Sequence, residues 1–158
     1  MSSQTHLSRS LNGVETEVAI LNYADRVLVL VTQLSKIGHM IQASIPSTVP
    51  LLPLTPTDDG LPLIEPHPSV ELISIFGSAP SAHLTTLHSL YASHIATLVW
   101  TMTAQSEETG KRRDVIVGLA FKNSQDVSAH DTGLSSGEQT TFKGVMSMIV
   151  ALLQGKDR

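Results

Sequence analysis

The chain has 158 residues, 41% of them apolar, and a formal net charge of −4, which fits one globular domain over residues 1–158 with its own core. The longest apolar run is far shorter than the roughly 20 residues of a membrane span, so we expect no membrane segment. The absence of cysteine excludes disulfides, thiolate catalysis and cysteine-bound zinc, and agrees with a reducing, intracellular compartment.

The N-terminal part of the chain predicts a flexible segment followed by a hairpin. Residues 1–12 contain no apolar run, and we expect them to be a flexible N-terminus. Residues 14–23 alternate loosely between apolar and polar side chains, and the strongly apolar residues 27–33 follow after a turn. The two segments therefore predict a pair of strands that form a hairpin.

A second turn, which contains Lys36 and Gly38, leads into a third strand that ends near Ile45. We expect Gly38 to have a positive φ in this tight turn, and the three strands to form a meander. Residues 46–68 then contain seven of the eight prolines. Because proline lacks a backbone donor, this segment is predicted to be a long loop rather than a helix or a central strand.

The second half of the chain predicts two strands that alternate with two helices. The strands are residues 70–76 and 114–121. The first helix begins close to Pro80, and the second begins at Ser136 with the spacing of a capping box and stops at Gly155. The expected fold is α+β, with a mainly antiparallel sheet of a three-stranded meander plus two further strands, and with two helices, in the order βββ-loop-β-α-β-α.

Two of the predicted strands are apolar on both faces. In residues 27–31 valine alternates with leucine, and in residues 114–121 one face is formed by small residues, as expected for a closely approached surface. If both helices cover the same face, the other face must meet a partner, whereas one helix on each face would need none. Periodicity leaves both arrangements open. The candidate partner-binding residues in these strands are Leu28, Leu30, Ile116 and Ala120.

Three short segments resemble one known family. "LVLVTQ" at residues 28–33, followed by "SKIG" at residues 35–38, closely resembles the second strand and turn of the proteasome assembly chaperone 3 family. "TEVA" at residues 16–19 precedes them as it does in that family, and the later order of strand, long helix, strand and helix is similar. The resemblance covers most of the chain and is specific in "LVLVTQ" with its turn. The long N-terminal tail and proline-rich loop suggest a fungal-type member.

The resemblance implies a non-enzymatic chaperone in the cytoplasm or the nucleus, without ATP, metal or cofactor. Members form a heterodimer with a second small chaperone of similar fold, of the proteasome assembly chaperone 4 type. The pair holds alpha-type subunits, notably the fifth, while the alpha ring of the 20S core particle is built. We also expect the chain to self-associate when it is alone. The alternative is an adaptor or small-molecule-binding α+β module that uses the same apolar face.

The motifs that could indicate an enzyme have a poor context. "GLSSG" at residues 133–137 matches the G-x-S-x-G turn of serine hydrolases, with Ser135 as the nucleophile. However, no histidine follows the serine, and the preceding strand ends about ten residues earlier, so Ser136 as a helix cap explains the segment better. We therefore expect no catalytic residues.

Metal and nucleic-acid binding are also not expected. Ligands on one helix face need a spacing of three or four residues, but the histidines of the first helix are five and six residues apart, so we expect them at the surface: His83, His88 and His94. The basic cluster at residues 111–113 lies beside acidic residues, which favours a solvated loop over a phosphate-binding patch.

Charge is unevenly distributed along the chain. Residues 37–110 contain six acidic residues and neither lysine nor arginine, so their charge is −6 and the rest of the chain carries +2. Three of these acids, Asp58, Asp59 and Glu65, lie in the proline-rich loop and could contact a basic, partly apolar surface of an alpha subunit. The loop could equally be a spacer. Lys36 in the matched turn is a further candidate contact, with a solvated turn residue as the alternative.

Overall fold

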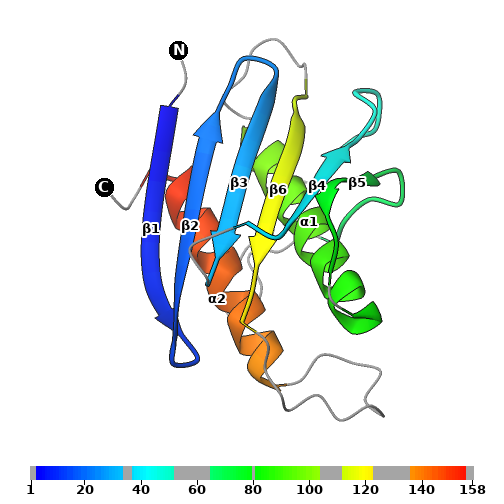
Figure 1. Ribbon diagram of the computed structural model, residues 1–158. Coiled ribbons are helices and arrows are strands. Elements are labelled where there is room, and N and C mark those ends of the chain that lie inside the picture. The colour runs from blue at the N-terminus through cyan, green and yellow to red at the C-terminus, as the bar shows by residue number, and fades with distance from the viewer. Residues whose placement is uncertain are drawn as a thin grey trace.

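The computed structural model describes residues 3–33, 37–51, 65–79, 81–103, 112–122 and 136–155. In chain order these residues form β1 (Ser3–Leu11), β2 (Val14–Asn22), β3 (Arg26–Thr32), β4 (His39–Ser44), β5 (Glu71–Gly77), α1 (Ala82–Thr103), β6 (Asp114–Ala120) and α2 (Ser136–Leu153). The strands form one sheet in the order β1-β2-β3-β6-β4-β5, and both helices lie on the same face of it (Figure 1). The predicted α+β class, with a mainly antiparallel sheet and two helices, is confirmed.

The N-terminal segment differs from the expectation, because residues 3–11 form β1 instead of a flexible tail. This strand pairs with β2 along its whole length, from Ser3 opposite Asn22 to Leu11 opposite Val14. The connecting turn has Asn12 at φ +52° and Gly13 at φ +79°, as the tight two-residue turns of hairpins require. As an edge strand with many polar side chains, β1 has no apolar run that would reveal it.

The predicted hairpin between the strands now labelled β3 and β4 is wrong, because β6 lies between them. Val117 of β6 pairs with Val29 of the parallel strand β3 and with Ile41 of the antiparallel strand β4. The meander consists of β1, β2 and β3 instead. The physical reason is burial: every residue of β6 after its first is buried, which a strand reaches most readily in the middle of a sheet.

Gly38 does not have the positive φ that we predicted, since the glycines with positive φ in the described residues are Gly13, Gly77 and Gly155. The chain from β3 to β4 passes the end of β6, where the Gly38 amide donates to the carbonyl of Leu119 at 3.2 Å. The glycine that this corner requires is Gly77, at φ +68°, because a Cβ atom there would collide with the carbonyl oxygen of Gly38. It lies opposite His39 at the end of β5.

The core lies between the sheet and the two helices. α1 packs on β4 and β6, and α2 packs on β1 and β2. The Ser81 hydroxyl accepts from the amide of Leu84 at 3.2 Å and caps α1 close to the predicted start, and Gly155 at φ +69° follows the end of α2 as predicted. Neither helix combines the length and the hydropathy that a membrane crossing would need in the described part of the chain.

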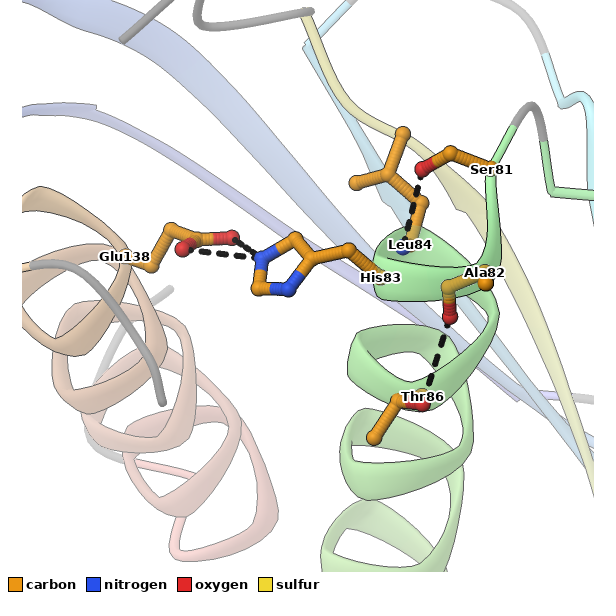
Figure 2. A network of polar contacts seen from close by, with 6 residues as sticks. All are labelled: Ser81, Ala82, His83, Leu84, Thr86 and Glu138. Carbon is orange, nitrogen blue, oxygen red and sulfur yellow. Dashed lines mark hydrogen bonds and ion pairs between the residues drawn. The ribbon is translucent and has the colours of Figure 1, made fainter. Parts of the chain in front are cut away.

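A polar contact joins the first turns of the two helices. His83 Nε2 lies 2.8 Å and 3.1 Å from the two carboxylate oxygens of Glu138, and Figure 2 shows this pair bridging α1 and α2 beside the Ser81 cap. The prediction that the three helix histidines lie at the surface is wrong. His88 is only 4% exposed, and His83 and His94 are half-buried, because α1 is enclosed by the sheet and α2.

The predicted proline-rich loop is described only in part. Residues 46–51 and 65–68 contain neither helix nor strand, in agreement with the prediction, and residues 52–64 lie outside the described residues. Ser135 of the "GLSSG" segment also lies outside them.

Candidate functional site: the open face of the sheet

One face of the sheet carries neither α1 nor α2 (Figure 1). Side chains alternate along each strand, so the residues between the buried valines of β3 point to this second face, which we call the open face. The strand register sets these side chains in rows across the sheet. One row contains Leu21, Leu28, Ile116, Gln42 and Ile73, and the next contains Ala19, Leu30, Gly118, Met40 and Phe76.

The structure brings together the four predicted partner-binding residues of the strands. Leu28 and Leu30 are half-buried and accessible on the open face. Ile116 and Ala120 share the face but are only 8% and 7% exposed, because longer side chains on the neighbouring strands surround them. The accessible part of this predicted set is therefore the pair of leucines on β3.

The small residues of β6 are approached from within this chain. A Cβ atom on Gly118 would lie 2.8 Å from Cδ2 of Leu30 and 3.1 Å from Cγ2 of Ile37. These two side chains therefore lie over Gly118 and fill the space that its missing side chain leaves. The close approach expected at this position exists, and it is intramolecular.

The other predicted contacts are Lys36, Asp58, Asp59 and Glu65. Lys36, Asp58 and Asp59 lie outside the described residues. Glu65 is exposed, and its negative charge acts to raise the pKa of His94, although burial lowers that pKa overall.

Sequence reasoning missed the most exposed apolar residues, which belong to the edge strand β5. Ile73, Ile75 and Phe76 are 54%, 46% and 61% exposed. Ile75 is an extra residue in the pairing with β4, since Ser74 lies opposite Ile41 and Phe76 lies opposite Met40. The signal available in the sequence was a run of three large apolar residues within four positions. A strand of this kind is fully buried only at the centre of a sheet, so at an edge its apolar side chains are exposed.

Polar groups surround this apolar surface. On β1 and β2 the Ser8 hydroxyl donates to the carboxylate of Glu15 at 3.0 Å. At the start of β6 the carboxylate of Asp114 accepts at 3.0 Å from the amide of Gln42, which is the one polar side chain within the two rows. An apolar centre with a polar rim is typical of surfaces that bind proteins. The two central rows contain no acid, base or nucleophile, so this central part of the face can bury an apolar surface but offers no group for proton transfer.

Potential metal ligands do not cluster either. No group of three or more histidine, aspartate or glutamate side chains that could hold a metal ion occurs within the described ranges. The open face is a candidate binding surface because of its accessible apolar side chains.

Comparisons with known proteins show a likeness to solved structures, with no match at the level of sequence families. No protein-family model matches the chain, and no curated protein matches it. A chain from the crystal structure of a novel chaperone complex for yeast 20S proteasome assembly aligns with it at a TM-score of 0.47 and 10% sequence identity, over 94% of this chain and 98% of that chain.

Proposed function

We propose that this protein is a non-enzymatic assembly chaperone that pairs through its open face with a second small chaperone of similar fold. The observation that carries the proposal is the accessible apolar surface around Leu28, Leu30, Met40 and Phe76, on the face that neither helix covers. A contiguous exposed apolar surface of this kind is rare on a protein that acts as a monomer. The absence of acid-base groups from its two central rows supports binding rather than catalysis.

The resemblance of residues 28–38 to the proteasome assembly chaperone 3 family supports the identity of the partners. On this basis the companion is a chaperone of the proteasome assembly chaperone 4 type. The pair acts in the cytoplasm or the nucleus, where it holds alpha-type subunits, notably the fifth, during assembly of the 20S alpha ring. Without its companion the chain self-associates through the same apolar face.

A lysine on the open face tests the pairing. Leu28→Lys should weaken binding to the companion at least about a hundredfold, because an interface would bury an unpaired charge. The isolated fold should tolerate the change, since Leu28 is half-buried and a lysine can extend into water. Thr86→Lys is the matched control, because Thr86 is an exposed residue of α1, on the helix-covered side.

Native mass spectrometry and circular dichroism separate the outcomes. The expected result is a folded Leu28→Lys chain that stays unpaired, beside a Thr86→Lys chain that pairs normally. A folded Leu28→Lys chain with unaltered affinity, and the same result for Leu30→Lys, would remove the open face from the interface.

Contact with the alpha subunit is tested through charge. We propose that Asp58, Asp59 and Glu65 approach a basic surface of that subunit, because residues 37–110 carry a charge of −6. Asp58→Asn combined with Asp59→Asn should slow association and reduce its salt dependence, with little change in the chaperone pair. If deletion of residues 55–65 leaves the rate and the affinity for every alpha subunit unaltered, the loop is a spacer.

A further inference from the structure

Three polar side chains form a continuous hydrogen-bonded chain between α1, β4 and the edge strand β5. Nδ1 of His88 lies 2.9 Å from Nδ1 of His39, and Nε2 of His39 lies 2.8 Å from the hydroxyl oxygen of Ser74. His88 and His39 are 4% and 5% exposed, whereas Ser74 is exposed at the edge of the sheet. The chain therefore connects a buried imidazole of α1 to the outermost strand.

Two nitrogens at this distance share one proton, because one ring must donate and the other must accept. If His39 donates to His88, Nε2 of His39 accepts from the Ser74 hydroxyl. If His88 donates, Nε2 of His39 donates to Ser74, whose own proton can reach the Gly77 carbonyl at 3.4 Å. In both arrangements the two rings together are neutral. A second added proton would place two N–H groups face to face and end the contact.

The surroundings oppose even one added proton. His88 also lies beside the ring of Phe121, with ring centres 6.0 Å apart. The acid of β5 is Glu71, which pairs with Ser44 at the far end of β4, and the base next to Phe121 is Lys122, which is exposed. Burial lowers the pKa of His39, and burial together with the charge of His39 lowers the pKa of His88 to about 4.

β5 is otherwise weakly attached to the sheet. It pairs with β4 alone, and all of its side chains except that of Leu72 are exposed. Few buried apolar contacts mean that a segment can open at low cost, so a hydrogen-bonded side chain matters more here than in the core.

We propose that His39, His88 and Ser74 form a proton-sensitive latch that fastens β5 to the sheet, and that proton uptake releases β5 while the rest of the sheet stays folded. Each ring in the opened state would be free to take up a proton in water, whereas in the closed state burial disfavours the first added proton and the contact between the two Nδ1 atoms does not survive the second. Because Ile73 and Phe76 end the two rows of the open face, opening would also alter the partner-binding surface, a consequence that rests on the proposed function.

Hydrogen exchange of the isolated full-length chain tests the latch without any partner. With a pKa of about 4 for His88 when closed and about 6.5 when open, opening should become about 20-fold more favourable between pH 7 and pH 5. We therefore expect amide protection in residues 71–77, corrected for the chemical exchange rate, to fall by about that factor, while protection in β2 and β3 stays constant. Protection in β5 that is independent of pH, or that falls together with β2 and β3, would overturn the proposal.

A variant and a direct titration make the test decisive. His88→Phe should keep an aromatic ring beside Phe121 and make β5 protection much less sensitive to pH, and undiminished sensitivity would contradict the latch. Should this variant not fold, NMR titration of the unmodified chain replaces it. Both His39 and His88 must then titrate below pH 6.5, and ordinary titration of either ring would refute the closed neutral pair. These readouts do not involve the companion chaperone, so a failed latch is distinguishable from a failed pairing.

Discussion

Replacing Gly77 with alanine should destabilise the corner where β4 and β5 meet. Gly77 has φ +68°, and a Cβ atom added there would collide with the carbonyl oxygen of Gly38 and lie 3.4 Å from Cα of His39. The atoms that it meets belong to the backbone, so no side-chain rotation can relieve the collision. The beginning of β4 and the end of β5 must move apart.

The size of the effect follows from three contributions. The left-handed conformation raises the free energy of the folded alanine variant by about 1–2 kcal/mol. The lower conformational entropy of alanine in the unfolded chain offsets about 0.4–1 kcal/mol of this loss. Separating the backbones at His39 and Gly77 costs a further 1–3 kcal/mol or so, because buried polar groups lose their partners. Gly77→Ala should therefore lower the free energy of unfolding by about 3 kcal/mol.

Gly13 provides the matched control, because it has φ +79° and an added Cβ atom would meet nothing within 4 Å. Gly13→Ala has the conformational cost without the collision and should lose about 1 kcal/mol. Urea unfolding, followed by fluorescence of the single tryptophan, gives both values. Equal losses in the two variants would refute the reasoning, because they would show that the β4–β5 corner accepts a Cβ atom freely.

Further predictions concern the turn before β4, the core and the helix pair. Gly38→Ala should change the free energy of unfolding in urea by less than about 0.5 kcal/mol. The φ of Gly38 is not positive, and the nearest atom to an added Cβ is 3.9 Å away. A loss above about 1 kcal/mol would contradict this prediction. Trp100→Phe should lower the free energy of unfolding by about 2 kcal/mol, because the buried indole donates at 2.7 Å to a backbone carbonyl. Thermal unfolding measures the change, and an unchanged melting temperature would argue against that hydrogen bond. A double-mutant cycle with His83→Ala and Glu138→Ala should give a coupling of about 0.5–1 kcal/mol, and zero coupling would show that the pair contributes nothing.

Local periodicity was sufficient for the two helices and for strands β2 to β6, but not for β1 or for the order of the sheet. β6 is apolar on both faces because both faces are buried, each in a different way, and the sequence does not distinguish the two kinds of burial. Its central position buries one face under α1, and neighbouring side chains cover Ile116 and Ala120 on the other. We interpreted two-faced apolarity as a sign of either a partner or a helix on each face, although it also indicates a central strand. The same ambiguity left the edge position of β5 unpredicted, although the strand itself was predicted at residues 70–76.

The assignment of faces could not be predicted, yet the sequence contains a clue to it. Alternation alone separates Leu28 and Leu30 from the valines between them, without saying which set meets the helices. In the structure the helices cover the valines of β3 and β6, whose uniform size gives an even surface at a constant distance from a helix layer: Val27, Val29, Val31, Val115 and Val117. The open face mixes leucine, isoleucine, methionine and glycine, and Leu30 with Ile37 folds over Gly118. A helix packs poorly on such an uneven surface, so a partner that binds there must match its shape side chain by side chain.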